Sequence, residues 1–580
     1  MRSHSRLAAL SALGALLGLI GGGAAWLLVH LIGLVTSLAL FHQWSWEAPS
    51  FTELDRSPLI PLTAMAGALA VALLARWAPA IRGHGIPETM EAVLERQSRI
   101  APRVAVAKPI SAALAIGTGG PFGAEGPIIV TGGAAGSLLG QLLPVSPSER
   151  KILLASGAAA GMAATFGAPM AAVVLAVELL LFEFSTRALL PLVLAASVAG
   201  AMHQVLFGAD PLFSVPTQDF PGLSTLPVFA LLGLTSGLVA CVIARGLFLF
   251  EAGFRRLPVG ELWHPVIGAA GFGLVGLAAP RALGVGYDAI GDVLQARMAL
   301  TAVAVLAGAK LLAWWIALAS GTSGGTLAPI LLISAGFGSL FGAAVEHLAP
   351  GLGVSATACA LVAMAAVFGS ATRASFTGIV FVFELTRDYE AVVPLMVATA
   401  LACVVTTALM SESLMTEKLA RRGLRVANHY EVDALTTASV RQIMSAPVRT
   451  VCADTSVAAA QETILSGGHS AYPVVDEHGA ILGMVSRGDL LELDEGGQDR
   501  IVDHASRDVV AIQPSALARD ALHLMLEEEV DHLPVTDHGR LVGIVTRTDI
   551  LGVRRRGLDH DRPQAGSASR LVSHMRRRSG

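Results

Sequence analysis

Two glycine-rich stretches of this chain are weak copies of each other, and each interrupts an apolar run. Gly117–Gly140 reads GTGGPFGAEGPIIVTGGAAGSLLG, and Gly321–Gly342 reads GTSGGTLAPILLISAGFGSLFG. Pro127 corresponds to Pro329, 202 positions later. Broken hydrophobic segments at corresponding places in two halves are typical of a transport protein whose substrate lies at the repeat interface. The duplication therefore predicts the class of the protein before any single residue is considered.

A second repeated pair follows at a shift of 206 residues. Ala168–Leu179 reads APMAAVVLAVEL and Ala374–Leu385 reads ASFTGIVFVFEL, which places Glu178 opposite Glu384. Buried acidic side chains are costly in a bilayer, so both are expected to have partners that the sequence does not reveal. Because the glutamate recurs in both halves, we expect a packing or hydrogen-bonding role for it.

The composition is that of a polytopic membrane protein. Of the 580 residues, 53% are hydrophobic and 14% are charged, and the mean hydropathy is +0.64. Leu7–Leu40 contains no Asp, Glu, Lys or Arg. A membrane-spanning helix needs about 20 apolar residues and a signal peptide has only about 7–15, so this run predicts a retained helix. The four cysteines are scattered without a paired spacing, which indicates no disulfide framework or metal site. The net charge is −4, and no nucleic-acid partner is expected.

The sequence changes character near Ser411–Arg425, after which it is that of a soluble α/β module. This module has its own duplication, in which Gly483–Leu491 (GMVSRGDLL) corresponds to Gly543–Leu551 (GIVTRTDIL), 60 residues later. Each copy predicts a helix, two strands and a second helix. The pair resembles tandem CBS domains.

Three short loops in the membrane part place glycine before a proline that suits the first turn of a helix. A helix N-terminus exposes unpaired N–H groups and a partial positive charge, and glycine lets the backbone approach an ion closely. Several converging N-termini make an anion site without a full positive charge, which would hold the ion too tightly. The loops are Gly83–Pro87 (GHGIP), Gly123–Pro127 (GAEGP) and Gly325–Pro329 (GTLAP).

These loops and the duplication resemble the CLC family of chloride channels and chloride/proton exchangers, from Leu7 to about Arg425. The resemblance implies an all-α polytopic membrane domain of two inverted repeats, assembled as a homodimer with one pore per subunit in the plasma or inner membrane. A soluble α/β tandem CBS pair follows. The expected divisions are a membrane domain 1–425 with repeats at about 60–207 and 226–412, a linker 426–439, CBS domains 440–496 and 497–556, and a basic disordered tail 557–580.

Clustered arginines predict which end of the membrane domain faces the cytoplasm, because cytoplasmic loops carry an excess of Lys and Arg. Both chain termini are expected on that side. The arginines are Arg2, Arg6, Arg255, Arg256, Arg421, Arg422 and Arg425.

The resemblance also implies roles for single residues. Glu125 matches the family's gate, a carboxylate that occupies an anion site and then swings away or takes up a proton. A carboxylate is stabilised at a helix N-terminus, where chloride would also bind, although a capping glutamate that never moves is the alternative. Lys108 matches a family lysine that would attract anions; a lysine that extends to the headgroups is the alternative. The implied chloride-binding residues are His84, Gly85, Ile86, Gly123, Gly126, Thr326, Leu327, Ala328 and Met415.

The chain departs from the family pattern at three pore positions. His84 replaces a serine: a ring that faces the pore could donate an N–H, whereas a ring that points away would leave only backbone amides there. Met415 replaces a tyrosine, and Leu327 replaces a phenylalanine. Two hydroxyl donors are therefore missing, which leaves the selectivity among chloride, nitrate and other anions open.

A further departure bears on the transport mechanism. Exchangers of the family usually carry an inner proton glutamate directly after the position of Glu178, and here that residue is Leu179. Glu183 could take its place, or it could simply pair with Arg187 at a helix end. We therefore expect a gated chloride channel, with a weakly or atypically coupled chloride/proton antiporter as the alternative.

The CBS-like copies carry an [ST]-x-x-D element whose aspartate contacts the ribose of an adenine nucleotide in that family. Ser486 with Asp489 and Thr546 with Asp549 match it. The same residues can equally be plain helix N-caps. ATP, ADP or AMP is thus a candidate ligand of the pair, which would modulate the pore, and no cofactor is expected to be required.

One string favours an enzyme. Gly321–Gly325 satisfies the G-x-S-x-G pattern of a serine nucleophile at Ser323. The first half has Gly117–Gly120 (GTGG) at the equivalent place, with no serine. Ser323 is therefore interpreted as a variable position in a repeated loop, and the chain is not expected to be an enzyme.

Overall fold

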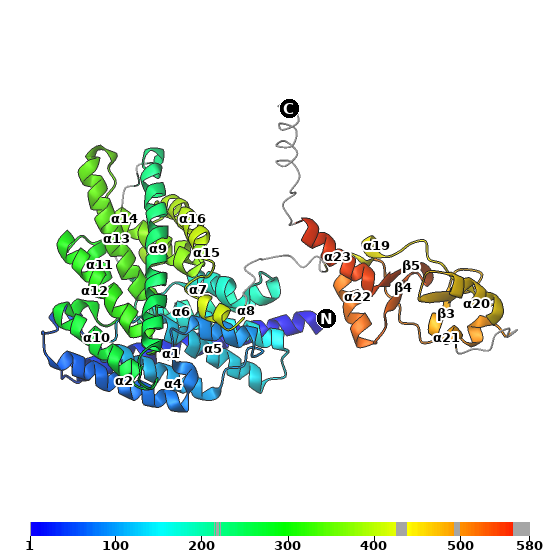
Figure 1. Ribbon diagram of the computed structural model, residues 1–580, viewed down its shortest axis with the longest axis horizontal. Helices are drawn as coiled ribbons and strands as arrows, with labels where there is room; N and C mark the ends of the chain where they lie inside the picture. Colours follow the sequence, from blue (N-terminus) through cyan, green and yellow to red (C-terminus); the bar gives the residue numbers. More distant parts are fainter. Residues whose placement is uncertain are drawn as a thin grey trace. The chain divides into compact units, whose positions relative to one another are not determined.

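The computed structural model describes residues 2–213, 215, 220, 222–424, 435, 438–491 and 499–560. The chain divides into two compact units, Met1–His429 and Tyr430–Gly580 (Figure 1). Most of the expected linker, 426–439, and also Arg425 lie outside the described residues.

The first unit is built from helices packed around a large apolar core (Figure 1). Seven helices in the described part of the chain are long and apolar enough to cross a membrane, and α1 contains the predicted Leu7–Leu40 run. The helices are α1 (Arg2–Leu40), α2 (Leu59–Trp77), α3 (Ile86–Leu94), α4 (Pro102–Gly117), α5 (Glu125–Leu142), α6 (Pro147–Phe166), α7 (Pro169–Ala176), α8 (Thr186–Leu206), α9 (Leu226–Arg255), α10 (His264–Ala278), α11 (Tyr287–Leu294), α12 (Leu300–Ala319), α13 (Leu327–Leu348), α14 (Ala356–Thr372), α15 (Ser375–Thr386), α16 (Val392–Leu409) and α17 (Glu417–Arg421).

The high glycine content serves close helix packing. A Cβ at Gly132 of α5 would overlap the carbonyl oxygen of Gly157 of α6, and a Cβ at Gly157 would overlap that of Gly132. In the second half, Gly338 of α13 meets the carbonyl oxygen of Cys359 of α14 in the same way. Small residues at such crossings let backbones pack directly, which is how helices associate in lipid. The repeated glycines thus fix equivalent helix pairs in both halves.

The two halves have opposite orientations. At the start of α1, Arg6 bonds Glu149 in the first turn of α6, with Nε and Oε1 2.6 Å apart. Beyond the end of α1, the Ser50 hydroxyl donates to Asp288 in the first turn of α11. The counterpart of α6 is α14, which begins beside α11, since the Thr357 hydroxyl donates to the carbonyl of the last residue of that helix. Equivalent helices therefore begin at opposite ends of the unit, as the inverted-repeat prediction requires.

The second unit contains two small α/β modules, each with its own core. In the first, β1 (Val451–Cys452) pairs parallel with β2 (Ala471–Val475), which pairs antiparallel with β3 (Ile481–Ser486). In the second, β4 (His532–Asp537) pairs antiparallel with β5 (Arg540–Thr546). The helices are α19 (Val440–Ile443), α20 (Val457–Ser466), α21 (Arg487–Leu491), α22 (Ala518–Glu527) and α23 (Arg547–His560).

Each module therefore has the predicted helix, two strands and helix. The expected disordered tail is wrong at its start, because α23 continues to His560 rather than ending before residue 557. Residues 561–580 of that tail lie outside the described residues.

Candidate functional site

The three glycine loops meet at the centre of the first unit. The N–H of Gly325 donates to the carbonyl of Gly123 at 2.9 Å, and the N–H of Gly123 donates back to Gly325 at 3.2 Å. Gly83 forms a backbone bridge with Ser323 of the same second-half loop. Ser323 also accepts a hydrogen bond from the Ser111 hydroxyl, which fits a structural position in this loop. Backbone pairing thus joins the starts of α3, α5 and α13.

The first turns of α3 and α5 also touch directly. Gly85 has φ of 98°, a backbone conformation that side-chain-bearing residues rarely adopt. A Cβ at Gly85 would overlap the carbonyl oxygen of Gly126, and a Cβ at Gly126 would overlap that of His84. Glycine at both positions is therefore required for the two helix N-termini to approach each other.

Glu125 lies where these N-termini converge. It is the first residue of α5, and its side chain is fully buried. Its Oε1 accepts a hydrogen bond from the Tyr287 hydroxyl at 2.9 Å, whereas Oε2 has no partner within the described residues. A Cβ at Gly123 would overlap Oε2, and a Cβ at Gly325 would lie 2.8 Å from it. The carboxylate thus lies against both halves of the protein.

The other residues expected to bind the anion are buried around the same loops. His84 is buried, and neither of its ring nitrogens has a hydrogen-bond partner in the part of the chain that the structure describes. A buried polar atom without a hydrogen-bond partner costs free energy, and a bound anion or water removes that cost. Met415 is buried two residues before α17, a helix that packs against α3. Ile86, Thr326, Leu327 and Ala328 are also buried, at the starts of α3 and α13.

Two lysines bind loop carbonyls at equivalent positions of the two halves. The Lys108 ammonium donates to the carbonyls of Ile81 and Gly83 at 2.7 and 3.0 Å. Lys310, 202 positions later, donates to the carbonyls of Gly284 and Val285 ahead of α11. Both side chains are fully buried, so the alternative of a Lys108 that extends to the headgroups is wrong. Lys310 was not identified from the sequence, although the repeat spacing points to it.

The repeated glutamates have the partners that the sequence could not reveal. Glu178 accepts from the N–H groups of Phe376 and Thr377, at the start of α15. Glu384 accepts from the N–H groups of Met170 and Ala171, at the start of α7. Each half therefore supplies the cap for a helix of the other, which confirms a hydrogen-bonding arrangement for both residues.

Glu183 lies away from the central loops, near the N-terminal ends of α6 and α8. Its carboxylate is 4.0 Å from the Lys151 ammonium and accepts from the Ser185 hydroxyl. The alternative in which Glu183 pairs with Arg187 is wrong, because Arg187 instead donates to Glu149 at 2.7 Å. Leu179 is buried in an apolar environment.

In the second unit, both [ST]-x-x-D elements act as helix caps. The N–H of Ser486 donates to Asp489 at 2.8 Å, and the N–H of Thr546 donates to Asp549 at 2.9 Å. Thr546 and Asp549 also line a cavity of about 310 Å³. His532 lines the same cavity, and burial lowers the pKa of its imidazole, against the opposing effect of Asp531 and Asp549.

Known proteins resemble both units. The family described as voltage gated chloride channel matches residues 66–407, and the CBS domain family matches residues 440–496 and 501–556. An H(+)/Cl(−) exchange transporter ClcA of Vibrio campbellii is 30% identical over 361 residues, which are 61% of this chain and 77% of the relative. The crystal structure of a slow cyanobacterial Cl−/H+ antiporter superposes with a TM-score of 0.63 at 26% identity, covering 72% of this chain and 97% of that one. A eukaryotic CLC transporter has the same fold, with a TM-score of 0.58 at 20% identity, over 93% of this chain and 97% of its own.

Proposed function

The chain belongs to the voltage gated chloride channel (CLC) family, and from this premise we propose that it conducts chloride through a path gated by Glu125. It is an integral membrane protein with two C-terminal CBS domains, and its relatives are transporters and not enzymes. The observation that carries the proposal is the buried Glu125 carboxylate at the convergence of three helix N-termini. In the open state, a chloride ion replaces the carboxylate there.

The anion is held mainly by backbone dipoles, because the buried cations Lys108 and Lys310 are engaged with carbonyl oxygens of the loops before α3 and α11. N–H groups at the starts of α3, α5 and α13 carry the partial positive charge that a halide requires. The unpartnered ring nitrogens of His84 offer one further donor. Such a site binds an anion firmly enough to admit it and loosely enough to release it.

We also propose that the arginine-rich end of the membrane domain faces the cytoplasm. Arg6 and Arg187 meet at Glu149, and Arg150 donates to the carbonyl of Gln97. The C-terminal end of α9 lies beside α17, where Lys418, Arg255 and Arg421 surround Glu251. An excess of Arg and Lys marks the cytoplasmic side of membrane proteins. Cysteine labelling from outside intact cells would test this, since labels at the opposite end, near Ser50, should react first.

Reconstituted protein tests channel against exchange. The reversal potential is measured under a pH gradient at equal chloride on both sides. A passive chloride path keeps the potential at zero, whereas coupled proton movement shifts it with pH. Buried, aliphatic Leu179 at the inner proton position favours the passive outcome.

Chloride/proton exchange is the second candidate, because the Vibrio relative and the cyanobacterial protein are named as an exchange transporter and an antiporter. In this chain Glu183 is the carboxylate proposed to accept the inner proton. A pH-dependent reversal potential that disappears in Glu183→Gln would establish this route. A potential that persists in Glu183→Gln would exclude it.

For the CBS pair, we propose adenine nucleotide binding at the second element, because Thr546 and Asp549 line a cavity together with Arg449. Titration with ATP, ADP and AMP should give binding that Asp549→Ala removes. Asp489→Ala, at the matching cap of the other module, should leave it unchanged. Loss of binding in both variants would contradict the assignment.

A homodimer is also proposed, through α7, α8, α15 and α16. These helices present large apolar side chains at the surface of the unit, among them Met170, Leu194, Phe376 and Val393. Crosslinking through a cysteine at Phe376 in native membranes should give a dimer band.

A further inference from the structure

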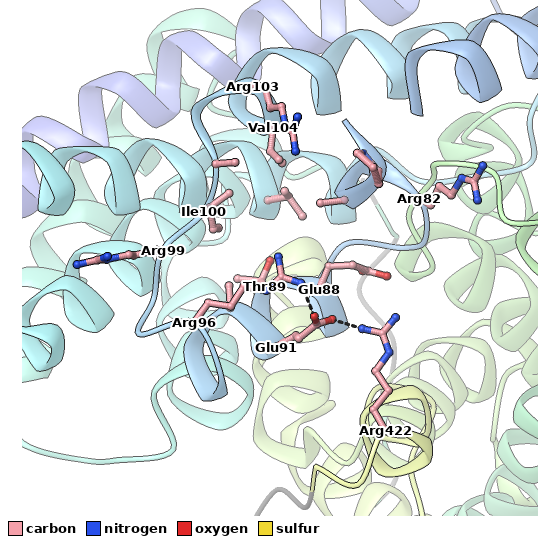
Figure 2. Close-up of a pocket in the computed structure, with 15 residues that line it drawn as sticks. Arg82, Glu88, Thr89, Glu91, Arg96, Arg99, Ile100, Arg103, Val104 and Arg422 are labelled. Atoms are coloured by element: carbon pink, nitrogen blue, oxygen red, sulfur yellow. Dashed lines mark hydrogen bonds and ion pairs between the residues drawn. The ribbon is translucent and has the colours of Figure 1, made fainter. Parts of the chain in front are cut away.

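A second basic site lies beside α3, outside the proposed anion path. It is a cavity of about 440 Å³, bounded by α3, the start of α4 and the residue that follows α17 (Figure 2). Glu88 lines it and accepts from the N–H of Gly85 at 2.7 Å, so this carboxylate separates the cavity from the Gly83–Pro87 loop. None of the residues assigned above to the anion site or gate lines this cavity.

Positive charge dominates the cavity. Five arginines line it against two glutamates, Glu88 and Glu91. Arg96 and Arg422 both bind Glu91, at 2.6 and 2.5 Å, and Figure 2 shows the two side chains directed toward that carboxylate. The arginines are Arg82, Arg96, Arg99, Arg103 and Arg422.

Two of these arginines have no counter-charge. Arg82 pairs with Glu261, but the guanidinium groups of Arg99 and Arg103 make no ion pair or hydrogen bond with any residue that the structure describes. Guanidinium groups bind phosphate oxygens in a two-pronged geometry, which makes clustered arginines a phosphate site. A net charge of about +3 in a cavity of this size therefore suits a doubly or singly charged phosphate.

The cavity opens at the boundary between apolar and polar surface. Trp77 ends α2 two residues before the lining residue Pro79, and it is 53% exposed. On α4, Val106 is 56% exposed one turn beyond Arg103. Exposed tryptophan and aliphatic side chains next to arginines are typical of the lipid headgroup level. Basic pockets between membrane helices at this level bind acidic headgroups.

We propose that this cavity binds the phosphate of an anionic lipid headgroup through Arg99 and Arg103. A bound phosphate also competes with Glu91 for Arg96 and Arg422. Because Arg422 directly follows α17, and Met415 lies two residues before it, the lipid acts on a helix that borders the proposed anion path.

The test measures lipid retention by native mass spectrometry of the purified full-length protein in detergent, with added phosphatidylglycerol or phosphatidylcholine. Wild type should retain phosphatidylglycerol preferentially. The double variant Arg99→Ala with Arg103→Ala should bind phosphatidylglycerol about 25-fold more weakly, because each arginine contributes about fivefold to the affinity. Glu91→Gln should strengthen it, because the competing carboxylate is gone.

The matched control is Arg256→Ala, since Arg256 is an exposed arginine after α9 that does not line the cavity. Arg99→Lys with Arg103→Lys keeps the charge and should keep most of the binding. This variant therefore distinguishes loss of charge from misfolding as the cause of weaker binding in the double alanine variant. Equal retention of the two lipids, or wild-type retention by the double alanine variant, would overturn the proposal. If millimolar inorganic phosphate binds to the arginines while phosphatidylglycerol does not, the ligand is a soluble phosphate and the lipid assignment is wrong.

Discussion

The hydroxyl of Tyr287, at the start of α11, donates a hydrogen bond to Oε1 of Glu125, at the start of α5, over 2.9 Å. The two residues come from different halves of the inverted repeat. The sequence lacks the family's pore tyrosine at Met415, yet a tyrosine from α11 supplies a hydroxyl to the proposed gate. We infer that this hydrogen bond holds the carboxylate in its blocking position.

Removal of the Tyr287 hydroxyl should therefore open the path more often. A hydrogen bond to a charged group contributes about 1.5–3 kcal/mol, which corresponds to roughly 10- to 100-fold in the gating equilibrium. Tyr287→Phe should raise chloride efflux from liposomes accordingly. Tyr389→Phe is the control, because Tyr389 is 77% exposed. Unchanged efflux in Tyr287→Phe would mean that the hydrogen bond does not set the gate.

Neutralisation of the gate itself should remove its response to protons. Glu125→Gln keeps the shape of the side chain but cannot change charge, so efflux should become independent of pH. The measurement is the initial rate of chloride efflux across a series of pH values. A variant that still responds to pH as wild type does would assign pH sensing to another group.

The two buried lysines should act on different loops. Lys108→Met leaves the Ile81 carbonyl without a donor and the Gly83 carbonyl with only the Gly324 N–H, at a cost of about 1–3 kcal/mol, and should lower chloride flux about tenfold. Lys310→Met loosens the loop before Tyr287 and should raise flux, as Tyr287→Phe does. Lys151→Met, at the periphery near Glu183, serves as the control. Identical effects of the two core variants would contradict separate roles.

Because Glu178 caps α15 and Glu384 caps α7, removal of either carboxylate should destabilise the folded protein. Glu178→Ala leaves two N–H groups and the Thr377 hydroxyl unsatisfied, which should cost about 2–4 kcal/mol. Glu384→Ala should cost a similar amount at α7. Thermal unfolding in detergent measures both. Glu183→Ala, which removes a partly exposed carboxylate, should stay within about 0.5 kcal/mol of wild type.

His532 gives the CBS unit a pH dependence of defined sign. Burial lowers the pKa of the folded imidazole below its usual value, so the unfolded state binds the proton more readily. The contribution of His532 to the stability of the folded unit is therefore fully present above the pKa of the unfolded state. It decreases as the pH falls through and below that pKa. Thermal unfolding of the isolated unit at several pH values should show this decrease, and His532→Asn should reduce it. An equal acid loss in both proteins would exclude His532 as the cause.

Much of the site was predictable because the repeat encodes it. The shift of 202 residues pairs the two glycine loops that exchange hydrogen bonds in the structure, and it also relates Lys108 to Lys310. Tyr287 was missed because the loop before α11 lacks the proline that marks the first-half loop, so it carries no comparable motif. The partners of Glu178 and Glu384 could not be predicted, since pattern along the chain says nothing about which distant helix end each carboxylate reaches.

The reciprocal capping of α7 and α15 has a consequence for biosynthesis. The acceptor for the Ala171 N–H lies 213 residues further along the chain, at Glu384. At a synthesis rate of about 5–20 residues per second, the start of α7 waits roughly 10–40 s for that carboxylate to leave the ribosome. During this interval the nascent first half lies in the bilayer without the cap of α7. We therefore expect it to bind insertion factors that shield polar backbone from lipid.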